Sequence, residues 1–163
     1  MKVVFRRAAE EDWSSIWPIF TAVVAGGDTY AYSPDTGFDE GRHLWMEGDG
    51  REVFVAQVDD VVAGTAYLRP NQPGLGDHVA NAGWMISPTH RGLGLGRSFA
   101  EYVIEEAKAA GYLAMQFNAV VASNEAAIRL WRSLRFEIVG TVPDAFRHTD
   151  LGPTAVHVMH RPL

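Results

Sequence analysis

Residues 91–98 read RGLGLGRS, and this stretch decides how the rest of the chain is interpreted. It joins an apolar, strand-like segment at residues 78–87 to a helix-like segment at residues 99–111. A loop that leaves a strand and opens a helix is a good anion site. The first backbone N–H groups of the helix have no partner within it, and the helix dipole is positive there. The stretch therefore predicts a loop that binds a negatively charged group.

The residue types in this loop favour phosphate. Glycine lets a ligand come close to the backbone and allows positive φ, while arginine adds charge-assisted hydrogen bonds. The spacing excludes two familiar phosphate loops: the Walker loop needs Lys-Ser/Thr after its last glycine, and the dinucleotide fingerprint needs Gly-x-Gly-x-x-Gly. The residues that would hold the phosphate are Arg91, Gly92, Gly94, Gly96 and Arg97.

Composition limits the classes of protein that this chain can be. Its 163 residues are the size of one domain, which we place at residues 1–163, and 47% of them are apolar, as in ordinary globular proteins. A net charge of −6 argues against general binding to nucleic acid or anionic membranes. The absence of cysteine excludes disulfides, thiolate metal sites and a cysteine nucleophile. The N-terminus lacks a signal-like apolar run, so we expect a cytoplasmic protein.

Working outward from the loop, the periodicity predicts an order of β-α-α-β-β-β-α-β-α-β-β. Hairpins dominate the first half and βαβ-like crossovers the second, so we expect a mixed sheet with helices on both faces. Pro18 is expected to kink or break the first helix, and Gly26-Gly27 to end it. Expected strands are 2–8, two within 52–68 turning at Asp59-Asp60, 78–87, 112–121, 136–142 and 154–163; expected helices are 10–27, 40–48, 99–111 and 123–135; 143–152 is an expected loop.

Two segments resemble the GNAT N-acetyltransferases. GWMISPTHRGLGLGRSFAEYVI at residues 83–104 is similar to the family's central motif, Arg/Gln-x-x-Gly-x-Gly/Ala after a strand that ends in Ser-Pro. SNEAAIRLWRSLRF at residues 123–136 is similar to its downstream Asn-x-x-Ala-x-x-x-Tyr-x-x-Leu-Gly-Phe segment. The resemblance implies the GNAT fold, of α/β (mixed α+β) class. Its central sheet is mostly antiparallel, with about seven strands and a splay between the fourth and fifth, and has helices on both faces.

The resemblance also implies acetyl-coenzyme A as the acyl donor, an amine as the acceptor, and direct attack of the amine on the thioester in a ternary complex. By this resemblance the N–H of Ile86 meets the thioester carbonyl, and Asn124 contacts the pantetheine arm. The N–H groups of the three loop glycines, with Arg97 and Ser98, hold the pyrophosphate. Asn124 is equally well explained as a plain helix cap, and one residue can fill both roles.

The sequence departs from the family at three places. Trp131 stands where a tyrosine often protonates the departing thiolate; an indole is a poor acid, so Trp131 either lines the cofactor tunnel or is a core aromatic. Tyr30, Tyr32 and Tyr67 are the reserve acids. Asn81 stands near the usual glutamate base and would position a water.

The third departure is Arg135 in place of glycine, which affects only the end of the helix.

The acceptor is the least determined part. FNAVVASNEAAIRLWRSLRFEIVGTVPDAF resembles a branch that includes proline-analogue (azetidine-2-carboxylate) and small amino-acid acetyltransferases, which implies that Asn118 touches the substrate. Tyr30 and Tyr32 would form the opposite wall of the acceptor pocket. The alternative is that Asn118 is a polar residue at the end of the sheet and that both tyrosines are exposed.

We therefore expect an N-acetyltransferase acting on a small amine, an amino acid or an analogue. A peptide or protein acceptor and a non-catalytic acyl-coenzyme A sensor remain alternatives. A pocket closed at one end would favour metabolites, and an open cleft would favour peptides. His157 and His160 form an HxxH, but on a strand they point to opposite faces, so no metal is expected. The resemblance also allows a homodimer with the last strand at its interface.

Overall fold

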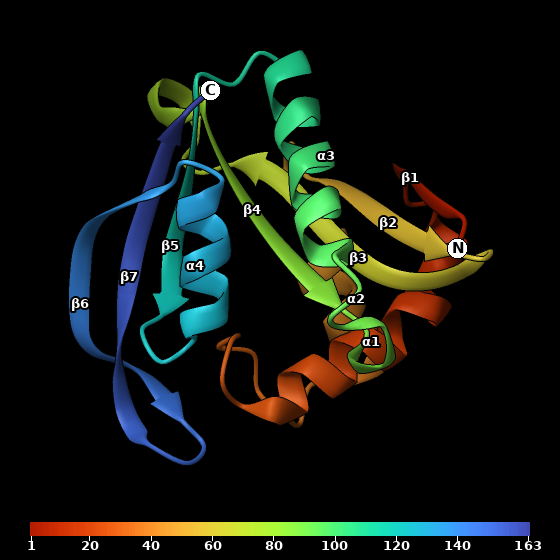
Figure 1. The fold of residues 1–163 in the computed structure, drawn as a ribbon, viewed down its shortest axis with the longest axis horizontal. Coiled ribbons are helices and arrows are strands. Elements are labelled where there is room, and N and C mark those ends of the chain that lie inside the picture. Colours follow the sequence, from red (N-terminus) through yellow and green to blue (C-terminus); the bar gives the residue numbers. More distant parts are fainter.

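The computed structural model describes residues 1–163 and contains one seven-stranded sheet with the strand order β1-β2-β3-β4-β5-β7-β6 (Figure 1). All neighbouring strands are antiparallel except β4 and β5, which are parallel. The expected mixed, mostly antiparallel sheet of about seven strands is thereby confirmed. The strands are β1 (Val3–Arg7), β2 (Glu52–Val58), β3 (Val61–Pro70), β4 (Val79–Ile86), β5 (Ala114–Val121), β6 (Glu137–His148) and β7 (Gly152–Pro162).

Helices cover both faces of this sheet. One face packs against α1 and α2, whose buried residues join Val53, Val55 and Met85 in one apolar cluster. The other face packs against α3 and α4, which share a larger cluster with Phe54, Leu68 and other sheet residues. The helices are α1 (Trp13–Gly26), α2 (Phe38–Met46), α3 (Leu95–Ala109) and α4 (Glu125–Ser133).

Neighbouring strands β4 and β5 separate soon after they meet. Their pairing covers only Val79 with Ala114 and Ala80 with Met115, after which the two strands diverge (Figure 1). The predicted splay between the fourth and fifth strands is therefore present. The following residues of both strands present unpaired edges to each other, and we call the gap between them the fork.

The structure corrects three local expectations. Helix α1 runs unbroken through Pro18, because its apolar side is buried against the sheet; Gly27, in the left-handed region at φ 63°, ends it. Helix α3 begins at Leu95, four residues earlier than expected, so Gly96 lies in its first turn. The expected loop at 143–152 is mostly strand: β6 bulges between Val142 and Phe146 and then pairs with β7 again.

The long hairpin of β6 and β7 returns to the α1 side of the molecule. At its tip, Thr149 donates from both its backbone N–H (3.1 Å) and its Oγ1 (3.2 Å) to the carbonyl oxygen of Gly27. The last strand, β7, lies between β5 and β6, so the free edge on this side of the sheet belongs to β6. None of the helices has the length and apolarity needed to cross a membrane.

Candidate active site

The fork exposes backbone groups of β4. Ser87 N–H donates to Ala63 O on β3 at 2.8 Å, and hydrogen-bonded positions alternate along an antiparallel ladder. The N–H of Ile86, one position earlier, therefore points away from β3 and toward β5. No β5 residue pairs with Ile86, because the ladder between these strands ends at Ala80. Ile86 thus offers a hydrogen-bond donor to a ligand in the fork.

Asn81 fixes the point at which the strands part. Its side chain is buried, its Nδ2 donates to Gln116 O on β5 at 3.0 Å, and its Oδ1 accepts from the Tyr67 hydroxyl at 3.2 Å. These bonds tie β4 to β5 where their backbone pairing stops. The amide is therefore occupied at both ends, and the structure gives Asn81 a positioning role between strands.

Tyr30 satisfies a carbonyl that the fork leaves without a partner. Its hydroxyl donates to Trp84 O at 2.8 Å, and burial raises the pKa of Tyr30 well above its ordinary value. The contact needs a glycine beside it, since a Cβ at Gly83 would lie 2.9 Å from the Tyr30 hydroxyl and 2.7 Å from Tyr67 Cε1. Tyr30 therefore shapes the fork and holds its proton firmly.

The glycine loop has the geometry that an anion site requires. Gly92 (φ 78°) and Gly94 (φ 76°) are left-handed, and a Cβ added to either would meet nothing within 4 Å. The first intrahelical bond runs from Ser98 N to Gly94 O, and no side chain caps the helix, so the earlier N–H groups of α3 face the open side of the loop. This end of α3 lies beside the end of β4.

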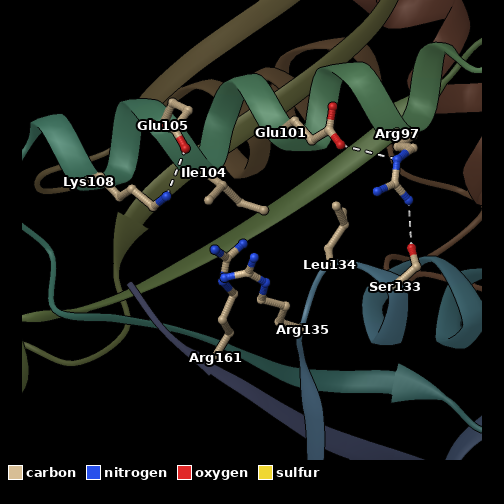
Figure 2. A pocket seen from close by; sticks show the side chains of 9 residues that line it. All are labelled: Arg97, Glu101, Ile104, Glu105, Lys108, Ser133, Leu134, Arg135 and Arg161. Atoms are coloured by element: carbon tan, nitrogen blue, oxygen red, sulfur yellow. Dashed lines mark hydrogen bonds and ion pairs between the residues drawn. The ribbon is translucent and has the colours of Figure 1, made fainter.

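The side chain of Arg97 points away from the loop, into the groove between α3 and α4. It donates to Ser133 Oγ at 2.8 Å and pairs with Glu101 at 3.1 Å (Figure 2). Arg91 follows the short turn Pro88–His90 and lies on the surface, and the Ser98 hydroxyl bonds to the carbonyl oxygens of Gly94 and Leu95. The backbone of the loop is therefore better placed as the anion holder than these three side chains.

The groove that Arg97 enters measures about 420 Å³. Arg135 and Arg161 reach into it from the side opposite α3, while Lys108 pairs with Glu105 (Figure 2). The groove is charged and open, and it runs away from the fork along α3. Its lining residues are Arg97, Glu101, Ile104, Glu105, Lys108, Ser133, Leu134, Arg135 and Arg161.

The two downstream residues have clear local roles. Asn124 is the N-cap of α4, as expected, and its Oδ1 accepts from Ala127 N at 3.3 Å. Trp131 packs in an aromatic cluster, with ring centroids 4.9 Å from Trp84 and 4.6 Å from Phe117. Because Trp84 and Phe117 lie on the two strands of the fork, Trp131 closes the α4 side of the fork. Trp84 Nε1 is buried there without a hydrogen-bond partner.

A chain of amides crosses the other face of the fork. Asn118 lies at a bulge in β5, where pairing with β7 skips from Phe117 to Val120. Its Nδ2 donates to Asn71 Oδ1 at 2.7 Å, and its Oδ1 accepts from Gln116 Nε2 at 3.0 Å. Asn118 and Asn81 are thus brought to the same end of the fork through Gln116.

The tyrosines expected in the acceptor wall are packed and not exposed. Tyr30 and Tyr32 stack with centroids 5.7 Å apart, and burial raises the pKa of Tyr32 to about 12. Tyr67 adjoins them, and burial raises its pKa as well. A phenol with a raised pKa holds its proton at neutral pH, so none of these tyrosines acts as a base. Their role as reserve acids stays a prediction.

Two arginines that sequence reasoning missed border these tyrosines. The guanidinium carbon of Arg51 lies 4.3 Å from the centroid of the Tyr67 ring, and Arg69 neighbours Tyr67 on β3. In the sequence they are ordinary charged residues at the ends of strands. One sequence signal was available: Arg69 comes two residues after Tyr67, which places both side chains on the same face of the sheet.

Histidines form no metal centre here. His157 and His160 lie on β7 opposite Val120 and Gln116, whose side chains lie on different faces, and His157 Nδ1 bonds to Thr141 Oγ1 at 2.8 Å. No group of three or more histidine or acidic side chains is arranged to hold a metal ion.

The fold and this site define an acetyltransferase. The acetyltransferase (GNAT) family model matches residues 9–136, and the chain belongs to this family.

Individual relatives agree with this assignment. A GCN5-related N-acetyltransferase from Kribbella flavida has 44% identity and a TM-score of 0.93, with 99% of this chain and 98% of that chain covered. A ribosomal-protein-alanine N-acetyltransferase from Brucella melitensis has 27% identity, a TM-score of 0.87, and coverage of 98% and 99%. The N-acetyltransferase aca1 of Schizosaccharomyces pombe is 40% identical over 84 residues, which are 52% of this chain and 40% of aca1. The chain thus spans less than half the length of that curated relative.

Proposed function

We propose that this chain transfers the acetyl group of acetyl-coenzyme A to the amine of a small molecule, an amino acid or an analogue. The observation that carries the proposal is the fork itself. An unpaired β4 edge leads directly into a glycine loop whose backbone N–H groups are free at the start of α3. A long ligand with a diphosphate at one end and amides along its length matches these two features together.

The fit of the diphosphate rests on the open space at the loop. Because a Cβ at Gly92 or Gly94 would meet no protein atom within 4 Å, the ligand can approach the backbone there. The unpaired β4 backbone would bond the pantetheine amides, and the N–H of Ile86 would bond the thioester carbonyl oxygen. A donor aimed at that oxygen stabilises the negative charge that develops on it.

The reaction that these groups support is direct attack. The lone pair of the neutral amine forms the new N–C bond at the carbonyl carbon, the C–S bond then breaks, and the sulfur leaves as a thiolate. The amine proton passes to water, and the thiolate takes a proton from solvent. Asn81 and Asn118 are amides and accept no proton. The exposed Asn118 would position the acceptor, while the buried Asn81 holds β4 to β5 at the base of the fork.

A contact between two distant segments favours a small acceptor. The two hydrogen bonds from Thr149 to Gly27 O join the β6–β7 hairpin to the start of the loop that carries Tyr30 and Tyr32. This contact leaves less room for an extended peptide beside that loop. A peptide acceptor is the second candidate, because the relative from Brucella melitensis, at 27% identity, is a ribosomal-protein-alanine N-acetyltransferase.

Free thiol release from acetyl-coenzyme A, measured against a panel of amines, tests the proposal. The chain contains no cysteine, so it contributes no thiol background. We expect release that depends on a small amine, and release only with peptides would favour the second candidate. Saturable binding of acetyl-coenzyme A without transfer to any amine would overturn the enzymatic proposal in favour of a sensor.

A further inference from the structure

Two cationic side chains lie together beside the fork, on the sheet face that carries α1 and α2. Arg51 immediately precedes β2 and Arg69 is near the end of β3; the register pairs Glu52 with Leu68, which makes the two arginines neighbours across the ladder. Tyr32 and Tyr67 adjoin both guanidinium groups. The four side chains form a half-buried patch, which we call the arginine pocket.

No carboxylate of the chain neutralises the arginine pocket. Every ion pair of the protein uses other residues, and neither Arg51 nor Arg69 takes part in one. By contrast, Arg6 is held by both carboxylate oxygens of Asp12, at 2.7 and 2.9 Å. The arginine pocket is therefore an uncompensated positive charge within a chain whose net charge is −6.

Part of the hydrogen-bonding capacity of these guanidinium groups is unused, and no charged acceptor meets them. Arg51 Nη1 donates to Leu44 O at 3.2 Å and Trp45 O at 3.0 Å, and Arg69 Nη1 donates to Pro70 O at 3.2 Å. The Nε of each arginine is buried without any partner. Buried N–H donors are normally satisfied, and an unsatisfied one costs free energy. The Tyr32 and Tyr67 hydroxyls are neutral neighbours of Arg51 and Arg69, and the two Nε–H groups still lack an acceptor.

Burial and mutual repulsion both act on these cations. Burial lowers the pKa of Arg51, and the charge of Arg69 lowers it further. Holding two cations together in a half-buried position is unfavourable unless an anion joins them. The Tyr67 ring offsets only part of this through its cation–π contact with Arg51.

The arginine pocket connects directly to the fork. The Tyr67 hydroxyl donates to Asn81 Oδ1, and Asn81 stands at the point where β4 and β5 part. Gly83, the next residue of β4 on this face, is approached by both Tyr67 and Tyr30. A molecule whose amine enters the fork from this face would place its remaining groups against the arginine pocket.

We infer that Arg51 and Arg69 bind the carboxylate of the acceptor, so that the amine acetylated by this protein belongs to a free amino acid or a close analogue. Arginine presents paired donors that match the two oxygens of a carboxylate. The inference rests on the proposed acetyl transfer and narrows its acceptor. It also predicts rejection of the same amine when its acid group is missing, because the cations would then stay unpaired.

Matched acceptors test this directly. The full chain is supplied with acetyl-coenzyme A and with free L-amino acids, each compared with its own amide, and thiol release is followed. We expect kcat/KM to be on the order of 100-fold higher for the acid than for the amide, the effect of losing hydrogen bonds to a charged group. Equal or better use of the amide would overturn the inference and leave the proposed transfer intact.

A substitution tests whether the preference for the acid over the amide comes from the arginine pocket. Arg69→Gln is the informative change, because Arg51 also holds the last carbonyl oxygens of α2. We expect Arg69→Gln to reduce kcat/KM for the acid by about 10- to 100-fold and to leave the amide unchanged. Arg129→Gln, an exposed arginine on α4 paired with Glu125 at 4.0 Å, is the matched control. An unchanged acid preference in a folded Arg69→Gln would overturn the inference.

A binding measurement distinguishes failure of the arginine pocket from failure of the proposed acetyl transfer. The shift in melting temperature caused by each amino acid and each amide is measured with coenzyme A present. We expect only acids to raise the melting temperature, and Arg69→Gln to abolish the rise. Amino acids that bind in this way without any acetyl transfer would support the arginine pocket and contradict the enzyme. No stabilisation by any acid would overturn the inference, whatever the transfer assay gives.

Discussion

The hydroxyl of Tyr30 lies 2.8 Å from the carbonyl oxygen of Trp84 and donates a hydrogen bond to it across the opening between β4 and β5. This bond replaces one that a paired β5 strand would have made. Tyr30→Phe removes the donor and leaves the carbonyl unsatisfied. We expect a loss of about 1–3 kcal/mol in the free energy of unfolding, measured by urea denaturation.

A second tyrosine serves as the control that distinguishes loss of the hydrogen bond to Trp84 from loss of a hydroxyl group alone. Tyr112 is part-buried and its hydroxyl has no hydrogen-bond partner in the protein, so Tyr112→Phe should change stability by less than about 0.5 kcal/mol. If both variants lose the same stability, the bond to Trp84 is not what holds Tyr30 in place.

Substitution at Gly94 tests the glycine loop. Gly94→Trp should abolish binding of acetyl-coenzyme A in calorimetry, because the new side chain would fill the open space in front of the α3 N-terminus. Gly111→Trp is the control: Gly111 also has positive φ and open space around it, but it follows the opposite end of α3. Both variants carry backbone strain of about 1–2 kcal/mol, so only the loss of binding distinguishes them. Retained affinity in Gly94→Trp would refute the loop assignment.

Local signals explain which features the sequence could predict. The glycines of the loop, the Asn124 cap and the Asp59-Asp60 turn depend on a few adjacent residues, and all three have the expected backbone geometry. The extension of β6 beyond Val142 was missed because it depends on pairing with β7 after a bulge, which is a tertiary property. The same holds for Pro18, since packing keeps α1 continuous.

The residues of the candidate site also differ in whether local sequence could predict them. Residue type and spacing predict the loop, and the resemblance of residues 117–146 to one branch of the family implies the role of Asn118; both roles stay predictions. Arg51 and Arg69 could not be predicted, since what marks them is that neither forms an ion pair in the fold. A sequence with 20 acidic residues gives no sign that none of them pairs with either arginine. Whether a charged side chain is paired depends on its neighbours in the folded structure, and the sequence alone does not show it.

Arg135 predicts a stabilising substitution. It follows the end of α4 with φ 72°, a conformation that costs a residue with a side chain about 1 kcal/mol relative to glycine. Arg135→Gly should therefore raise the free energy of unfolding by about 1 kcal/mol in thermal or urea denaturation. Arg132→Gly removes the same charge from within α4 and should lower it by about 1 kcal/mol. A loss of stability in Arg135→Gly would mean that its side chain makes contacts worth more than the strain.

The Arg6–Asp12 pair predicts how stability changes at acid pH. Hydrogen bonds from Arg6, and a further one from the Ala9 N–H at 2.7 Å, lower the pKa of Asp12 below its ordinary value. A carboxylate whose pKa is lower in the folded than in the unfolded state stabilises the protein above the unfolded value, near pH 4. That contribution is lost as the pH falls through the folded value.

Asp12→Asn should therefore cost about 1–3 kcal/mol at pH 7, and the difference from the wild type should shrink as the pH is lowered below 4. Denaturation by urea at pH 7, 5, 4 and 3 measures this convergence. Asp60→Asn, in the exposed pair with Lys2 at 3.4 Å, is the control and should change stability by less than about 0.5 kcal/mol at pH 7. Parallel curves for wild type and Asp12→Asn across this range would show that the Asp12 carboxylate is not preferentially stabilised in the folded state. The Arg6 contact would then be a surface pair without energetic weight.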